Sequence, residues 1–140
     1  MNKVAIITGA GTGVGKATAI KLSDAGFSVI LIGRRKEKLE ETKTECNDQA
    51  LVLPMDVSNE VDVKKCFEMI KKNFSRIDLL FNNAGTFLSS KTIDEINFYE
   101  WKEVFEVNIN GMFLFSKHAF SLMKSQSPMG GRIINNGSVS

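Results

Sequence analysis

The sequence has 140 residues, of which 43% are hydrophobic and 24% charged, as is typical of one soluble globular domain. A net charge of +2, with no basic stripe interleaved with aromatic residues, excludes an obvious nucleic-acid-binding protein. Two cysteines without a C-x-x-C motif and a single histidine give little support for a metal site. No signal peptide or membrane-spanning apolar run is visible, so we expect a cytoplasmic protein that does not associate with a membrane.

Apolar runs alternate with helix-like segments along the whole chain. The predicted strands are Val4–Thr8, Ser28–Ile32, Ala50–Pro54, Ile77–Phe81 and Arg132–Asn136. The predicted helices are Gly13–Ala25, Lys36–Cys46, Glu60–Phe74 and a long one from about Tyr99 to Met123. Unbroken apolar strands separated by helices indicate a parallel sheet that is covered on both faces. We therefore expect one α/β domain over residues 1–140, a doubly wound, Rossmann-like sheet of about five strands.

A glycine-rich loop, Thr8-Gly9-Ala10-Gly11-Thr12-Gly13-Val14-Gly15, follows the first strand and opens onto a helix. Glycines at this place let the backbone approach a phosphate group, and the helix N-terminus attracts its negative charge. A P-loop does not fit, because aligning its Gly-Lys on Gly15-Lys16 puts Ala10 at the first glycine and Ala17 at the Mg²⁺-binding hydroxyl. G-x-G-x-x-G fails in either register, and the spacing present is T-G-x-x-x-G-x-G. An ordinary strand-to-helix turn is the alternative.

The second predicted strand ends in Gly33-Arg34-Arg35, without an acidic residue. In dinucleotide-binding folds an acidic side chain near this place accepts the ribose hydroxyls, whereas an arginine accommodates a 2′-phosphate. The sequence therefore favours NADP(H) over NAD(H). The alternative is that Arg34 and Arg35 only begin a solvated helix.

Two predicted helices carry a clear apolar stripe. In the third helix the stripe consists of Val63, Cys66, Phe67, Ile70 and Phe74, and Cys66 is most simply a small core residue. In the long helix one face carries Trp101, Val104, Phe105, Met112, Phe115, Ala119, Leu122 and Met123. Asn108 lies within that face, and it is either a structural residue bonded to nearby backbone, part of a bend near Gly111, or functional. His118 lies off the stripe and receives no role.

The glycine loop resembles the cofactor loop of the short-chain dehydrogenase/reductase family. Four further segments match that family in the expected order, namely Asp56-Val57, Asn82-Asn83-Ala84-Gly85, Asn108-Ile109-Asn110-Gly111 and Gly131–Ser138. In the family the Asp meets the adenine amino group, and N-N-A-G steadies the sheet and lines the cofactor ribose. The motifs, with the two arginines, imply cofactor contacts at Gly9, Thr12, Gly13, Val14, Gly15, Arg34, Arg35, Asp56, Val57, Asn83, Ala84 and Gly85.

The same resemblance implies hydride transfer between a nicotinamide and a carbonyl or alcohol carbon of a small molecule. The family uses a Tyr-Lys pair as general acid/base, a Ser that binds the substrate oxygen and an Asn in a proton relay, and Ser138 and Asn108 match the last two.

The family's Tyr-x-x-x-Lys motif has no counterpart here, because the only tyrosine, Tyr99, has Glu103 four residues later. We therefore expect this incomplete domain to be inactive or severely impaired by itself. The alternative is a non-catalytic dinucleotide-binding module that completes its sheet with a partner. Substrate identity stays open, and a homo-oligomer is a further expectation.

Overall fold

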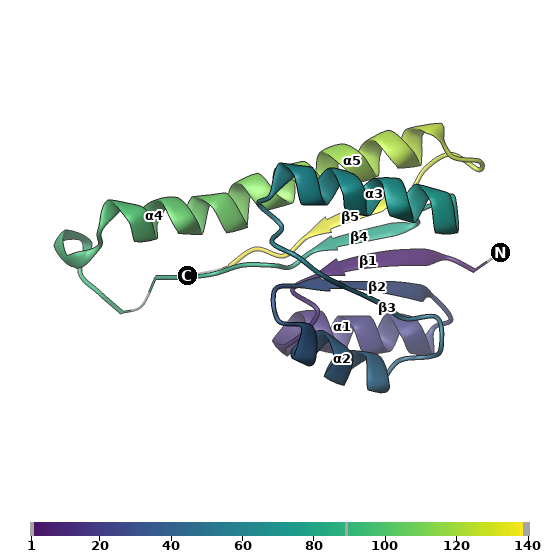
Figure 1. Ribbon diagram of the computed structural model, residues 1–140, viewed down its shortest axis with the longest axis horizontal. Helices are drawn as coiled ribbons and strands as arrows, with labels where there is room; N and C mark the ends of the chain where they lie inside the picture. The colour runs from purple at the N-terminus through teal and green to yellow at the C-terminus, as the bar shows by residue number, and fades with distance from the viewer. Residues whose placement is uncertain (1, 89, 139–140) are drawn as a thin grey trace.

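The computed structural model describes residues 2–88 and 90–138 and has helices on both faces of one parallel sheet (Figure 1). The sheet order is β3-β2-β1-β4-β5, which confirms the predicted five-stranded, doubly wound fold. The strands are β1 (Val4–Thr8), β2 (Ser28–Gly33), β3 (Leu51–Pro54), β4 (Leu79–Asn82) and β5 (Arg132–Asn135). The helices are α1 (Gly13–Asp24), α2 (Lys36–Thr44), α3 (Glu60–Phe74), the short 3₁₀ turn η1 (Ile93–Glu95), α4 (Phe98–Phe105), the π-helical turn η2 (Glu106–Gly111) and α5 (Met112–Ser125).

The central strand β1 is buried along its whole length because helices cover both faces of the sheet. Ile6 packs into a core with side chains of α3 and α5, including Phe67 and Phe115. The neighbouring residue Ile7 points to the other face, where it packs with Leu39 of α2 and other residues of α1 and β2. Figure 1 shows α1 and α2 below the sheet and α3 and α5 above it.

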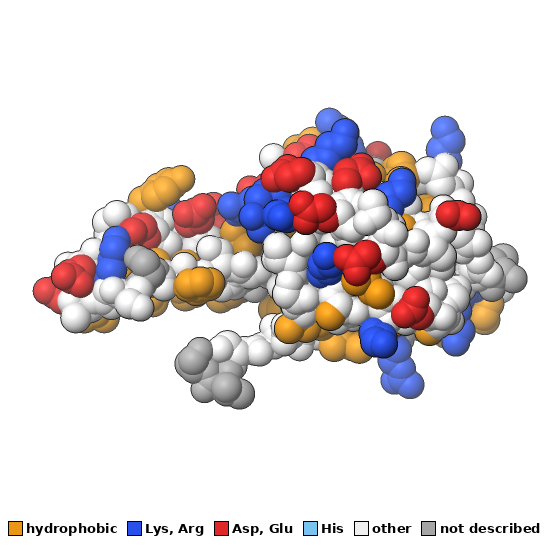
Figure 2. Space-filling view, turned by 90° about the horizontal axis from the view of Figure 1, so that it is seen from below, with side chains coloured by type: hydrophobic (Ala, Val, Ile, Leu, Met, Phe, Trp, Pro, Cys, Tyr) orange, Lys and Arg blue, Asp and Glu red, His pale blue; other side chains and the backbone are white. Residues whose placement is uncertain are grey.

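The long predicted helix is three elements in the structure. Only its second half, α5, packs on the sheet and buries Phe115, Ala119, Leu122 and Met123. The first half, α4, extends past the carboxyl ends of the strands, and hydrophobic side chains lie on the surface of this projecting segment (Figures 1 and 2). Trp101 and Phe105 therefore remain 47% and 43% exposed, although their spacing in the sequence matches the buried stripe. A periodic pattern of apolar residues indicates that they share one face of a helix. Whether that face is buried depends on whether the fold places other residues against it.

The stripe on α3 packs against the sheet as predicted, with Val63, Cys66, Phe67 and Ile70 buried. Burial raises the pKa of the Cys66 thiol to about 12, which makes it a poor nucleophile. His118 of α5 stacks on Phe67, with ring centroids 5.3 Å apart. Across residues 2–88 and 90–138, no helix combines the length and the apolar character needed to cross a bilayer.

Asp78 holds the start of β4 against β1. Its Oδ2 accepts a hydrogen bond from the Val4 amide at 2.8 Å, and Nη2 of Arg76 lies 2.6 Å from Oδ1. Burial by itself would raise the pKa of this carboxyl group, but the hydrogen bonds from Arg76 and Val4 outweigh it and hold the pKa below its ordinary value. The carboxylate therefore stabilises the fold above the pKa of the unfolded chain, about 3.9, and this stabilisation is lost as the pH falls through the lower folded-state pKa.

We predict that Asp78→Asn lowers the free energy of unfolding by about 1–3 kcal/mol at pH 7, because the charge-assisted hydrogen bonds from Arg76 are lost. Urea denaturation at pH 7 and at pH 3 measures the effect, and the difference from wild type should shrink at pH 3. Asp48→Asn, in an exposed turn, is the matched control and should change little at either pH. An equal effect of both substitutions at pH 7 would contradict the assigned role of Asp78.

Candidate functional site

Two adjoining cavities lie at the carboxyl ends of the strands. Their volumes are about 220 and about 640 Å³, and they adjoin along one crevice, because both are lined by Val57, Ala84, Gly85, Thr86 and Val107. The chain leaves β1 toward β2 on one side, while β4 lies on the other side of β1. This reversal of strand order is where doubly wound sheets bind their ligands.

The glycine loop closes one side of the first cavity and leads directly into α1. Gly13 has a φ of +55°, which other residues adopt only with strain, and a Cβ on Gly15 would overlap the carbonyl oxygen of Gly9. Thr12 is the N-cap residue of α1, yet within the described chain its side chain caps no amide of the first turn. The amide of Ala10 is already bonded to the carbonyl oxygen of Ile32 at 3.1 Å. The first turn of α1, rather than every amide of the loop, is thus the part available to an anion.

The Thr8 hydroxyl joins the glycine loop to the turn after β4. Its Oγ1 accepts hydrogen bonds from the amides of Asn83 and Ala84, both at 2.9 Å. The Asn83 side chain returns a hydrogen bond to the carbonyl oxygen of Gly9 at 3.3 Å. This clamp keeps the N-N-A-G turn beside the loop, where Ala84 and Gly85 line the first cavity. The site residue Thr8 was missed by the sequence analysis, and its position directly before Gly9 was the available signal.

Asparagine side chains position the end of β5 and the residues that follow it. Asn82 donates to Oδ1 of Asn135 at 2.9 Å and to Oγ of Ser116 at 3.0 Å. Nδ2 of Asn136 lies 2.8 Å from Oδ1 of Asn83. These bonds fix Asn135 and Asn136, and Ser138, two residues later, lines the second, larger cavity.

Asn108 lies in the π-helical turn η2 and also lines the second cavity. Its Oδ1 accepts from the amide of Thr86, and its Nδ2 donates to the carbonyl oxygen of the same residue, both at 2.8 Å. The structural alternative for Asn108 is therefore confirmed, because a nearby backbone satisfies its amide group. Gly111 ends the turn beside Val57, and a Cβ at Gly111 would approach the Val57 side chain to 2.6 Å. The turn fixes Asn108 against the cavity wall, so the structural role and a functional one are compatible.

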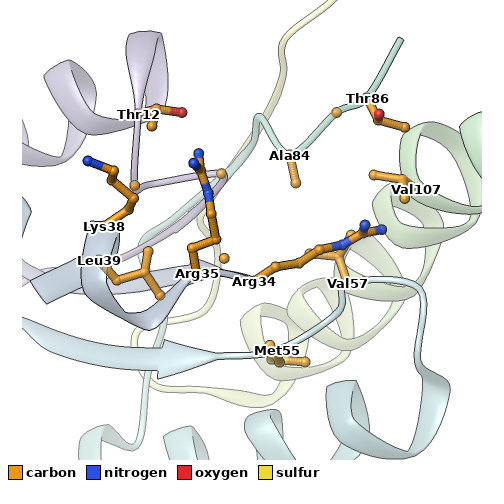
Figure 3. A pocket seen from close by; sticks show the side chains of 14 residues that line it. Thr12, Arg34, Arg35, Lys38, Leu39, Met55, Val57, Ala84, Thr86 and Val107 are labelled. Carbon is orange, nitrogen blue, oxygen red and sulfur yellow. The ribbon is translucent and has the colours of Figure 1, made fainter. Parts of the chain in front are cut away.

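The acid-free end of β2 forms the other side of the first cavity, with Arg34, Arg35 and Lys38 in its lining (Figure 3). Asp56 lines a neighbouring polar pocket beside α4, which it shares with Arg34. Burial by itself would raise the pKa of Asp56, but hydrogen bonds from the amide and hydroxyl of Ser58 and the charge of Arg34 hold it below its ordinary value. Asp56 is therefore a carboxylate at neutral pH.

The structure brings most of the predicted site residues to this crevice. The first cavity is lined by Gly9, Thr12, Arg34, Arg35, Val57, Ala84 and Gly85, and the second by Asn83, Asn108 and Ser138. Four others lie outside the two cavities: Gly13, Val14 and Gly15 form the first turn of α1, and Asp56 lines the neighbouring polar pocket. The sequence analysis did not predict cofactor contacts for seven further residues that line the first cavity, namely Gly11, Gly33, Lys38, Leu39, Met55, Thr86 and Val107. Gly11 lies in the glycine loop, Gly33 directly precedes the two arginines and Thr86 directly follows N-N-A-G, whereas no sequence motif marks the other four.

Residues 3–140 match the protein-family model described as short chain dehydrogenase. The chain belongs to the short-chain dehydrogenase/reductase family. It is 38% identical over 140 residues to an uncharacterised oxidoreductase of Staphylococcus aureus strain USA300, covering 99% of this chain and 59% of the relative. This short-chain dehydrogenase chain thus spans less than two thirds of the length of the relatives that it matches and corresponds to their N-terminal portion.

Two solved structures have the same fold as this short-chain dehydrogenase chain. A short chain dehydrogenase from Bacillus anthracis superposes with a TM-score of 0.87 at 37% identity, covering 95% of this chain and 56% of that one. A 3-ketoacyl-(acyl-carrier-protein) reductase from Brucella melitensis, complexed with NADH, has a TM-score of 0.90 at 30% identity and covers 95% and 55% of the two chains. The family resemblance in the sequence is therefore confirmed.

Proposed function

We propose that this chain is the cofactor-binding part of an NADP(H)-dependent reductase or dehydrogenase acting on a carbonyl or alcohol group of a small molecule. The observation that carries the proposal is the first cavity, which lies between the glycine loop and the acid-free end of β2 and adjoins the second cavity. A dinucleotide needs a phosphate site and a ribose site within one such crevice. The close packing of Gly15 on Gly9 leaves no room for a side chain between the loop and α1, as a phosphate cradle requires.

A nicotinamide dinucleotide would supply the hydride chemistry when bound, and the second cavity is lined by Ser138 and Asn108. Of the residues in this chain, Ser138 would donate a hydrogen bond to the substrate oxygen, on which negative charge develops as hydride arrives. Asn108, fixed by Thr86, would hold the helix turn that closes the cavity and take its part in the proton relay. The proton donor that completes such a reaction in the family is not supplied by the sequence of residues 1–140.

NADPH should bind more tightly than NADH, because the positive charge of Arg34 and Arg35 meets a 2′-phosphate at the edge of the first cavity. We predict that Arg34→Ala and Arg35→Ala together weaken NADPH binding by about 30-fold or more, the value of one to two charge-assisted hydrogen bonds. NADH binding should change little. Isothermal titration calorimetry with both cofactors measures the two affinities. Equal binding of NADPH and NADH by wild type, or no loss in the double variant, would remove the basis for this preference.

A non-catalytic dinucleotide-binding module is the second candidate, and one observation favours it. Strand β5 pairs with β4 on one side, and no described strand covers its other side. A partner chain could add a strand there. An open reading frame that continues into a Tyr-x-x-x-Lys motif would favour the catalytic proposal, and a genuine stop codon after Ser140 would favour the module.

Association between copies of the chain is a related proposal. Exposed aromatic and aliphatic residues follow one another along α4, η2 and α5, namely Phe98, Trp101, Phe105, Ile109, Phe113 and Phe120. Apolar surface of this extent is a common property of subunit interfaces. A monomer in sedimentation experiments at micromolar concentration would contradict it.

A further inference from the structure

A separate cavity lies in the groove between α3 and α5, which run side by side above the sheet in Figure 1. It has a volume of about 190 Å³ and shares no lining residue with the two cavities of the crevice. From α3 it is lined by Lys64, Phe67, Glu68 and Lys71, whose spacing of i, i+3, i+4 and i+7 places them on one side of the helix. The groove is therefore a second candidate binding site, away from the dinucleotide crevice.

The floor of this groove is apolar and aromatic. Phe67 and Leu122 lie there and are only 6% and 8% exposed. The half-buried His118 ring stacks on Phe67, with ring centroids 5.3 Å apart and ring planes 25° apart. Within the described chain the imidazole makes no hydrogen bond to another residue, so its nitrogens are available to a ligand. The floor thus offers apolar contact area beside a ring that can hydrogen-bond.

Three exposed charged residues of α3 surround that floor, namely Lys64, Glu68 and Lys71. Among residues 2–88 and 90–138, none of the three forms an ion pair within 4 Å. The two lysines are about 10.5 Å apart along the helix axis, so their long side chains can approach one anion from its two ends. Two ammonium groups and one carboxylate favour a singly charged anion, because Glu68 repels a second negative charge.

His118 is mainly neutral at pH 7. Burial lowers the pKa of its imidazole, and so does the positive charge of Lys117 and Lys64, whereas Glu60 and Glu68 raise it. The neutral ring has one N–H donor. An anion held in the groove would place negative charge beside the ring and would raise its pKa.

We propose that the groove between α3 and α5 binds a small organic monoanion, a carboxylate attached to an apolar body. Lys64 and Lys71 hold the carboxylate, and the apolar body lies on Phe67 and Leu122. Small-molecule sites commonly combine an apolar lining with a few polar groups that fix the orientation of the ligand. The groove lies outside the dinucleotide crevice, so this proposal and the proposed function stand or fall separately.

The test is an NMR titration of the 140-residue chain with sodium benzoate, observed at His118, the only histidine. Benzoate should shift the ring signals of His118 in a saturable way at about 1–10 mM and should raise its pKa. Binding should tighten as the pH falls from about 7.5 to about 6, because the protonated imidazole adds a cation. Benzyl alcohol, which lacks the charge, should bind at least about fivefold more weakly. Sulfate, a dianion without an apolar body, should give no saturable shift at the same ionic strength.

Two double variants of α3 separate the groove from the general charge of the helix. Lys64→Gln with Lys71→Gln should weaken benzoate binding about tenfold, as expected for two exposed ion pairs. Lys65→Gln with Lys72→Gln removes the same charge one residue further along α3 and should leave binding within about twofold. Thermal unfolding checks that both variants are folded. A shift that does not saturate, equal binding of benzyl alcohol, or an equal loss in the two variants would overturn the proposed site.

Discussion

Gly15→Ala is expected to weaken NADPH binding by about 100-fold or more. A Cβ at this position would overlap the carbonyl oxygen of Gly9 and would lie only 2.5 Å from Nδ2 of Asn83. Either the loop or α1 must then move, and the amides of the first turn lose their alignment with a phosphate. The loss of one to two hydrogen bonds to a charged group corresponds to this change in affinity. Calorimetric titration with NADPH measures it.

Substitutions at two other glycines distinguish an effect on NADPH binding from the effect of backbone strain alone. Gly26 has a φ of +87° and lies after α1, and no described atom lies within 4 Å of a Cβ built there. Gly26→Ala should therefore cost about 1–2 kcal/mol of stability without changing NADPH affinity. Gly13 has a similar φ, +55°, and similar free space around it, but it lies in the glycine loop. The effect of Gly13→Ala on NADPH affinity should therefore lie between those of Gly26→Ala and Gly15→Ala. Wild-type NADPH affinity in a folded Gly15→Ala variant would contradict the proposed phosphate site.

The 140-residue chain is expected to bind NADPH without oxidising it at an ordinary enzymatic rate. Ser138 and Asn108 line the second cavity, and the only tyrosine, Tyr99, is 74% exposed on the projecting helix α4. A positioned general acid typically contributes about 10²–10⁴-fold to such a reaction, and turnover should fall by at least this factor. The loss of NADPH absorbance in the presence of a panel of aldehydes and ketones measures the rate.

The full-length relative from Staphylococcus aureus, to which the chain is 38% identical, is the parallel control for that panel. A substrate that the relative reduces, and this chain does not, identifies the missing part of the chemistry. Robust NADPH oxidation by the homogeneous 140-residue chain would contradict the prediction. Tight NADPH binding without turnover is the result that we expect.

Most of the fold could be predicted because its signals are local. The apolar runs of β1 and β2 and the stripe on α3 need only neighbouring residues to be recognised, and all three are buried as expected. The boundaries were less accurate. The fourth predicted strand, for example, began at Ile77, whereas β4 begins at Leu79, although the amide of Asp78 already donates to the carbonyl oxygen of Val4 at 2.8 Å. The break of the long helix into α4, η2 and α5 was expected only as a bend near Gly111.

Contacts between segments far apart in the chain could not be predicted from the sequence. The pairing of Arg34 with Glu103 joins residues that no local pattern connects. The same is true of the bonds from Asn108 to Thr86 and of the Thr8 hydroxyl to the turn after β4. Each of these contacts depends on which loops meet at the carboxyl ends of the strands. The strand order β3-β2-β1-β4-β5 decides that.

The sequence by itself determined the α/β class, the glycine loop and the family, because hydrophobic periodicity and short motifs are properties of neighbouring residues. Only the tertiary structure decided which cations face the crevice, that Lys38 packs on Gly11, and that α4 has no sheet beneath it. The physical reason is that a side chain's charge and reach are encoded locally, whereas its partners are set by the packing of elements far apart in the chain.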